Sequence, residues 1–150
     1  MSTSTQQQHE RNLAVVGEIY SAFGRGDVES ILAVIADDCA WESWGEQNTA
    51  QAAGLSYLQP QTGPEGVGAF FGIVAQFEIH DFQVLDMFAG GDKVAVEVLI
   101  DATPPGGARF RDEELHLYTV GDDGKVTRMR HYVDTAKHVA ASRGEEPTGG

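Results

Sequence analysis

The C-terminal part of the chain carries the pattern that most restricts its fold. Residues 110–120 (FRDEELHLYTV) and 125–134 (KVTRMRHYVD) are rich in residues that favour strands, and a four-residue GDDG segment separates them. Two such segments joined by a short glycine-bounded turn predict a β-hairpin. With a four-residue turn, Val120 pairs with Lys125.

This register brings polar side chains together on one face of the hairpin. Glu114 lies opposite His131, and His116 lies opposite Met129. A slip of one residue would turn all of these side chains to the other face. The hairpin therefore predicts a carboxylate–imidazole pair beside a second histidine.

The rest of the chain places helical patterns before most of the strands. Helices are expected at residues 7–23, 28–36 and 64–77, and strands at residues 39–44, 79–88, 93–103, 110–120 and 125–134. Residues 45–63 lack periodicity and are expected to be a long connection that closes over a pocket as a lid. This order predicts an α+β fold, a cone-shaped curved antiparallel sheet wrapped around helices. We expect one domain over residues 1–142 and a flexible tail over residues 143–150.

Composition excludes several classes of function. The net charge of -13 argues against nucleic acid and anionic membranes as partners. No segment approaches the ~20 apolar residues of a membrane span.

The single cysteine, Cys39, is expected to be a small buried hydrophobe in a cytoplasmic protein. The five histidines show no ligand spacing and no glycine-rich phosphate loop is present, so neither a metal nor a cofactor is expected.

Several segments resemble the nuclear-transport-factor-2-like superfamily, and within it the SnoaL-like group of polyketide cyclases and ketosteroid isomerase relatives. The resemblance covers residues 12–141 and is carried by residues 19–27 (IYSAFGRGD), 31–38, 64–67, 70–71 and 123–135 together with Trp41 and Glu42. It implies a cone-shaped α+β barrel, a homodimer, and a pocket for a hydrophobic small molecule. It does not fix the reaction, because this fold hosts isomerases, dehydratases, hydrolases, cyclases and non-enzymes.

The catalytic residues of two related groups do not carry over to this chain. By the resemblance, the base and the two oxyanion donors of the isomerases fall on Ser43, Ile19 and His116. The arginine and the two acids of the epoxide hydrolases fall on Val98, Ile100 and His131. Neither established mechanism is therefore expected here, although both comparisons place His116 and His131 on the pocket side.

The candidate catalytic residues are His131, Glu114, His116 and Asp134. His131 is expected to act as a general base whose tautomer Glu114 fixes, with His116 donating to a developing oxyanion. Asp134 is the rival base, although the predicted register turns it outward toward Arg111. A satisfied polar pair without catalytic function is the competing interpretation of Glu114 and His131.

The expected pocket is lined by aromatic and aliphatic side chains with few polar groups. Its predicted substrate-binding residues are Ile19, Phe23, Trp41, Ser43, Tyr57, Val98, Ile100, Tyr118, Met129 and Val133. Glu42 and Asp101 are expected to point away from it. The outward side chains of Leu99, Leu115 and Leu117 predict an apolar surface that a second copy of the chain covers.

These residues predict a cofactor-independent cyclase or isomerase that acts on a hydrophobic oxygenated metabolite of polyketide or terpenoid type. An epoxide hydrolase or dehydratase of the same fold is one alternative. A non-catalytic protein that binds a hydrophobic ligand is the other, favoured by the loss of both families' catalytic acids.

Overall fold

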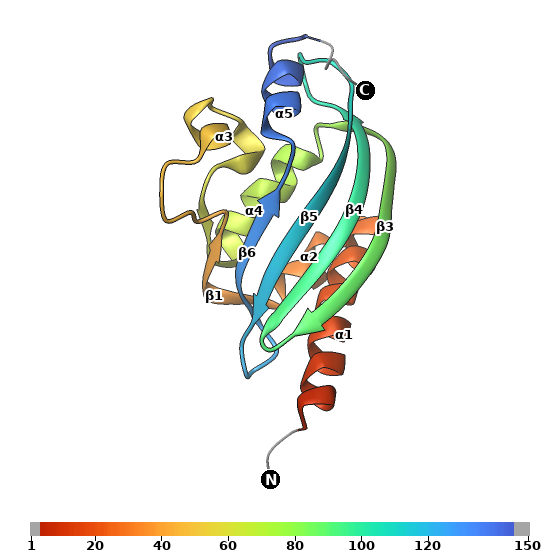
Figure 1. The fold of residues 1–150 in the computed structure, drawn as a ribbon, viewed down its shortest axis with the longest axis vertical. Coiled ribbons are helices and arrows are strands. Elements are labelled where there is room, and N and C mark those ends of the chain that lie inside the picture. The colour runs from red at the N-terminus through yellow and green to blue at the C-terminus, as the bar shows by residue number, and fades with distance from the viewer. Residues whose placement is uncertain (1–3, 146–150) are drawn as a thin grey trace.

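The computed structural model describes residues 4–145, which form a strongly curved six-stranded sheet with five helices (Figure 1). The strand order is β2-β1-β6-β5-β4-β3. The strands are β1 (Ile35–Trp41), β2 (Gln61–Thr62), β3 (Glu78–Gly90), β4 (Lys93–Thr103), β5 (Phe110–Val120) and β6 (Val126–Tyr132). The predicted α+β fold with a curved sheet around helices is confirmed, with one difference: β1 pairs with β6 in parallel.

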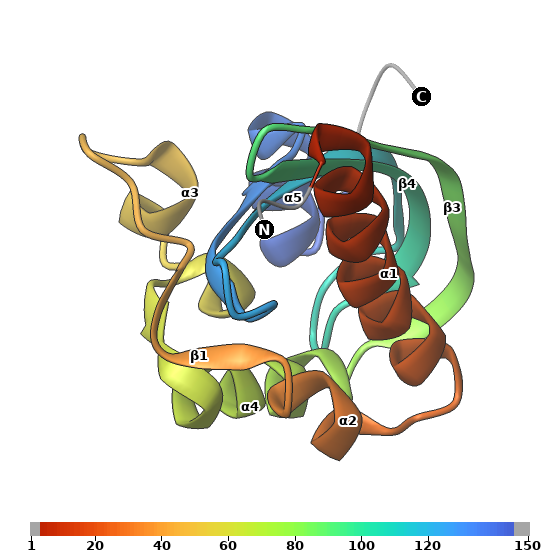
Figure 2. The same cartoon turned by 90° about the horizontal axis from the view of Figure 1, so that it is seen from below.

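The helices are α1 (Thr5–Gly24), α2 (Val28–Leu32), α3 (Thr49–Ala52), α4 (Gly63–Val74) and α5 (Thr135–Ser142). Figure 2 shows α1 against the concave side of the sheet near β3 and β4, and α4 beside β1. The core lies between these helices and the inward side chains of β4, which include Val94, Val96 and Val98, all fully buried. This packing leaves one end of the cone to be closed by α5 and the segment before β2.

The N-terminal cap and the spacing of apolar residues account for the position of α1. Ser4 accepts the backbone N–H of Gln7, and the Gln7 side chain accepts the Ser4 N–H in a capping box. Val16 and Ile19 lie three residues apart and are buried. The helix predicted from residue 7 is therefore confirmed and begins one half-turn earlier.

The second helix is shorter than its pattern suggests. It was expected over residues 28–36, but α2 ends at Leu32 and β1 already begins at Ile35. Ile35 stands four residues after Ile31, so it fits a helical stripe as well as a strand. Its pairing with Val126 of β6 decides in favour of the strand.

The connection over residues 45–63 is not structureless as expected. It contains α3, a short 3-10 helix η1 (Ser56–Leu58) and β2. Asn48 caps α3 by accepting the Gln51 N–H at 3.1 Å. Leu55 and Leu58 are each 3 % exposed, so this segment packs its own small core against the end of the barrel.

The hairpin forms, but its predicted register is wrong by two residues. Val120 pairs with Val126, because the turn spans five residues, with the Gly121 N–H donating to the Lys125 carbonyl at 2.8 Å. A bulge after this pair moves the register one residue further. His116 therefore lies opposite His131. Because the total shift is even, the side chains keep the face predicted for them.

The end of the final strand also differs from the prediction. The strand stops at Tyr132, and Asp134 is exposed and caps α5 by accepting the Lys137 N–H at 3.3 Å. The predicted pair between Asp134 and Arg111 is wrong; Arg111 lies 4.0 Å from Asp101 instead. The predicted tail begins after this helix, and its residues 146–150 lie outside the described part of the chain.

We predict that Asp134→Ala destabilises the protein by about 1 kcal/mol, the usual cost of removing an N-cap side chain. The measurement is the free energy of unfolding in urea. Asp122→Ala, which removes an exposed carboxylate in the turn before β6, is the matched control and should change this free energy by less. Equal effects of the two substitutions would show that the cap contributes nothing.

Candidate functional site

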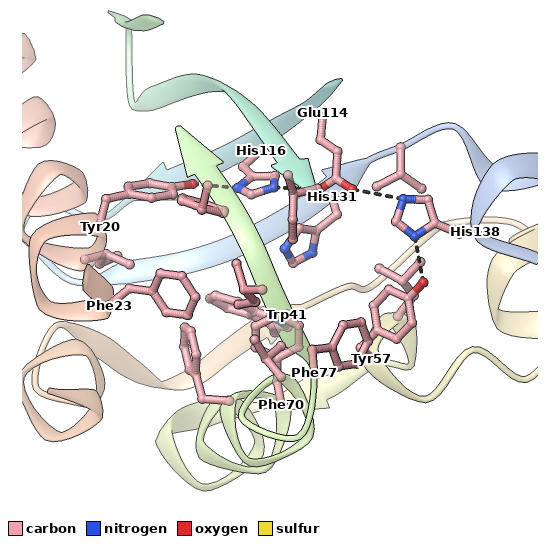
Figure 3. A pocket seen from close by; sticks show the side chains of 18 of the residues that line it. Tyr20, Phe23, Trp41, Tyr57, Phe70, Phe77, Glu114, His116, His131 and His138 are labelled. Carbon is pink, nitrogen blue, oxygen red and sulfur yellow. Dashed lines mark hydrogen bonds and ion pairs between the residues drawn. The ribbon is translucent and has the colours of Figure 1, made fainter. Parts of the chain in front are cut away.

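A pocket of about 740 Å³, including the space at its mouth, lies inside the cone. Figure 3 shows aromatic side chains from α1, β1, η1 and α4 facing a row of histidines from β5, β6 and α5. Its walls comprise Ile19, Tyr20, Phe23, Trp41, Tyr57, Leu58, Phe70, Phe71, Val74, Phe77, Ile79, Phe82, Ile100, Phe110, Glu114, His116, Tyr118, His131, Val133 and His138. An apolar pocket with a few polar groups suits a small organic ligand.

His131 is held by the carboxylate of Glu42. The Oε1 atom of Glu42 accepts both the backbone N–H of His131 and its ring Nδ1–H, the latter at 3.0 Å. Glu42 is 2 % exposed, and the His131 side chain is 10 % exposed. With Nδ1 bonded to a carboxylate, the neutral imidazole keeps its basic lone pair on Nε2.

This partner differs from the predicted one. Glu114 was expected to bond His131, and this expectation is wrong. Glu42 does not line the apolar pocket, as expected, but its carboxylate bonds His131 from the polar side of the wall. Glu42 follows the last residue of β1 with φ 58°, in the left-handed region. The predicted hairpin could not reveal this contact, because Glu42 does not belong to the hairpin.

Glu114 and His116 belong to a second polar group that reaches α1. The Tyr118 hydroxyl donates to Tyr20 Oη at 2.9 Å, and Tyr20 Oη lies 2.6 Å from His116 Nδ1. His116 Nε2 lies 3.1 Å from Glu114 Oε1. Because a carboxylate only accepts, Nε2 carries the proton and Nδ1 accepts from Tyr20. The chain of donors thus runs from Tyr118 to Glu114, and Figure 3 shows its part from Tyr20 through His116 to Glu114.

Burial sets the protonation of this second group. It lowers the pKa of His116, and the neighbouring His131 lowers it further, so His116 is neutral near pH 7. Burial also raises the pKa of Tyr20 and Tyr118, which keeps both phenols protonated. Burial alone would raise the pKa of Glu114, but its hydrogen bonds from His116 and His138 hold it well below the usual range.

His138, on α5, completes the polar groups at the end of the pocket. Its Nε2 lies 2.8 Å from Asp112 Oδ2 and 3.0 Å from Glu114 Oε2, and its Nδ1 lies 2.6 Å from Tyr57 Oη. Burial lowers its pKa, but the two carboxylates outweigh that effect and raise the pKa to about 9. His138 is therefore an imidazolium near pH 7. No sequence pattern assigns His138 a function, although an aspartate N-cap before an alanine-rich segment signals its helix.

Asp112, Glu114 and His138 are also close enough to be considered as a metal site, since their ligand atoms lie within 4.8 Å of one another. The nitrogen that faces both carboxylates, Nε2 of His138, carries a proton that is shared between them. The three side chains therefore satisfy one another as an ion-paired cluster, and the arrangement is not that of ligands converging on a cation.

A smaller polar pocket borders His131. It is lined by Glu42, Trp44, Asn48, Ala50, Leu58, His131, Tyr132, Val133 and Thr135. His131 therefore lies in the wall between an apolar pocket and a polar one, and Glu42 faces only the polar side.

The predicted site residues fall into two groups. Ile19, Phe23, Trp41, Tyr57, Ile100, Glu114, His116, Tyr118, His131 and Val133 line the apolar pocket. The other four do not: Ser43 is exposed, Val98 and Met129 are fully buried in the core behind the wall, and Asp134 caps α5. Of the segment expected to act as a lid, Tyr57 and Leu58 on η1 line the pocket.

Solved structures share this fold over nearly their whole length. An NTF2-like protein from Burkholderia xenovorans superposes with a TM-score of 0.70 at 24% identity, over 89% of this chain and 96% of that chain. TerC co-crystallised with polyporic acid gives 0.69 at 21% identity, over 89% and 98%. An LEH-like epoxide hydrolase from M. tuberculosis gives 0.66 at 17% identity, over 91% and 93%. These likenesses show a nuclear-transport-factor-2-like fold.

Sequence comparison gives the family. No curated protein matches the chain significantly. The model of the SnoaL-like domain matches residues 16–129, from the middle of α1 to the last buried residue of β6. The chain therefore belongs to the SnoaL-like domain family.

Proposed function

We propose that this protein is a cofactor-independent acid–base enzyme, a cyclase or isomerase that takes a proton from a hydrophobic oxygen-bearing small molecule. The observation that carries the proposal is the Glu42–His131 pair, whose ring bonds the carboxylate through Nδ1 and leaves Nε2 for a ligand. A buried carboxylate fixes the tautomer of the ring and stabilises the imidazolium that forms. Burying a carboxylate raises the free energy of the folded protein, and a protein that only binds a ligand gains nothing from that charge. The arrangement therefore favours a catalytic base.

The family and the neighbours support this proposal at the level of the fold. Relatives of the same shape include an epoxide hydrolase and a protein co-crystallised with a small acid. Neither fixes the reaction here, because their likeness lies below 25% identity.

Activation of water by the same base, as in a dehydratase or an epoxide hydrolase, is the second candidate. The polar pocket behind His131 favours it, since Glu42, Asn48 and Thr135 give water a polar route to the pair. A protein that only binds its ligand is the remaining alternative.

We predict that the protein exchanges the methyl protons of 2-acetonaphthone for deuterium in deuterium oxide, as followed by proton NMR. His131→Ala and His131→Gln should each slow this exchange by roughly 10²–10⁴-fold, the usual worth of a positioned base. Glu42→Gln should slow it by between about 10- and 10⁴-fold, because it removes the charge that fixes the tautomer.

Asp134→Asn is the control, because asparagine also caps helices and the residue lies outside the pocket. Loss of exchange in Asp134→Asn with normal exchange in His131→Ala would transfer the role of base to the aspartate. Binding of the ketone without any enzyme-dependent exchange would leave a binding protein.

We also propose a homodimer through the outer face of the sheet. The predicted patch needs one correction: Leu99 is only 8 % exposed, whereas Phe88 is 51 % and Tyr132 is 39 % exposed. On this face Leu117 stands between Ala95 and Arg130, and Leu115 between Glu97 and Tyr132. Acidic residues thus lie toward β3 and basic ones on β6, so a two-fold axis near the leucines would pair opposite charges.

We predict that the protein sediments as a dimer at micromolar concentration and that Leu117→Glu converts it to monomers, because a charge would be buried at the centre of the interface. Ala14→Glu, an exposed position on α1, is the control and should leave the dimer intact. A species of only 16.1 kDa for the unaltered protein would refute the dimer.

A cytoplasmic location is proposed from the cysteine. Cys39 is fully buried and free, and burial, with a smaller effect of Asp38, raises its pKa to about 11. A thiol of this kind is unreactive and suits a reducing compartment. Within residues 4–145, no helix has the length and apolar character needed to cross a membrane.

A further inference from the structure

Tyr57 is the one tyrosine of the pocket wall that lies outside the chain of hydroxyl donors. It comes from η1, lines the pocket, and makes one side-chain hydrogen bond among the described residues, to Nδ1 of His138 at 2.6 Å. The direction of that bond decides what the Tyr57 hydroxyl offers to a ligand.

The surroundings of His138 fix the direction. Its Nε2 lies between Asp112 Oδ2 and Glu114 Oε2, and its side chain is 2 % exposed. Two carboxylates buried beside one imidazole require a cation to offset their charge, so the ring carries protons on both nitrogens. An N–H at Nδ1 can only donate, and Tyr57 Oη is its acceptor.

The Tyr57 hydroxyl proton is therefore left for another acceptor. In the other two tyrosines of the wall the hydroxyl protons are already used, since Tyr118 donates to Tyr20 and Tyr20 donates to His116. A phenol that accepts a hydrogen bond from an imidazolium becomes a stronger donor itself. The α5 end of the pocket thus presents one polarised O–H group.

We propose that Tyr57 is a catalytic hydrogen-bond donor that holds the carbonyl oxygen of the substrate, and that His138 is the residue that positions and polarises it. This inference rests on the proposed function, because it places the carbonyl oxygen at Tyr57 and the adjacent C–H at His131. The substrate class is then a hydrophobic ketone with an acidic hydrogen next to its carbonyl group.

Proton transfer to His131 converts such a ketone into an enolate. The C–H bond breaks and its proton forms a bond to Nε2 of His131. The electron pair of that bond forms the C=C bond of an enolate, and the negative charge moves to the oxygen bonded by the Tyr57 O–H. In an isomerisation the substrate also carries a C=C bond that becomes conjugated with the enolate, and the proton returns from Nε2 to the far carbon of this dienolate. In a cyclisation the enolate carbon forms a bond to a second carbonyl carbon of the substrate, the π electrons of that C=O bond become an alkoxide, and the proton returns from Nε2 to the alkoxide.

The charge of the cluster selects a neutral ligand. With His138 protonated, Asp112, Glu114 and His138 together carry one net negative charge beside Tyr57. A ligand that arrives as a carboxylate or phenolate would be repelled, whereas a ketone acquires its charge only during the reaction. The same negative charge opposes the enolate, so the reaction depends on the Tyr57 hydrogen bond, which strengthens as charge develops on the oxygen.

The test is the infrared carbonyl stretch of 2-acetonaphthone bound to the protein, with the carbonyl carbon isotopically labelled. In the unaltered protein the stretch should move to lower frequency than in an apolar solvent, because the oxygen accepts a strong hydrogen bond. Tyr57→Phe should abolish this movement. Tyr118→Phe is the matched control and should retain it, because the Tyr118 hydroxyl proton is already donated within the protein.

The second measurement compares the affinity of the protein for 2-acetonaphthone with its affinity for 2-ethylnaphthalene, which has a similar shape but no oxygen. The unaltered protein should bind the ketone about 3- to 10-fold more tightly than the hydrocarbon, the worth of one good hydrogen bond, and Tyr57→Phe should bind them equally. An unchanged carbonyl stretch in Tyr57→Phe, equal affinities in the unaltered protein, or no binding of either compound would each overturn the inference. Neither measurement involves turnover, so failure of His131 as a base would appear only in the deuterium exchange.

Discussion

The structure depends on keeping carboxylates inside an apolar cone, which costs several kcal/mol per charge unless each one is paired. Every buried acid of the pocket region has a histidine as its partner: Glu42 with His131, Glu114 with His116, and Asp112 with His138. These pairs accompany two local features of the fold. Glu42 has a left-handed backbone and bonds His131 of the final strand. The helix α5 covers the open end both with His138, which reaches two carboxylates, and with Ala141, which packs on Ala102 and Phe110.

Pairing also leaves the pocket with little free polarity. His116 is held neutral between a tyrosine and a carboxylate, so it neither accepts a proton from a ligand nor donates one to it. In the proposed mechanism His131 Nε2 is the base and the Tyr57 hydroxyl is the donor. The two groups belong to different clusters, so each can be altered without disturbing the other.

The sequence predicts the fold well because the fold rests on periodic patterns. The alternation of β5 and the spacing of Val16 and Ile19 indicate which face is buried. The predicted hairpin register was wrong because it depends on an extra turn residue and a bulge, which are features of local backbone geometry. Each side chain still lies on its predicted face of the sheet, because a register shift of two residues leaves the faces unchanged. The bond between Glu42 and His131 was missed because it joins the residue after β1 to β6, and the hairpin pattern contains no information on that parallel pairing.

The family match has a consequence for where specificity resides. It ends at residue 129, so both histidines to which the proposed chemistry is assigned, His131 and His138, follow the matched region. Tyr57 lies within it, but on η1, in the connection where periodicity is weakest. In the proposed mechanism the curved sheet thus supplies a general apolar container, whereas the strand end, η1 and α5 supply the groups assigned to a ligand's reactive atoms. Changes in these short segments can alter the reaction while the core that holds the cone together remains the same, which is how one fold hosts many activities.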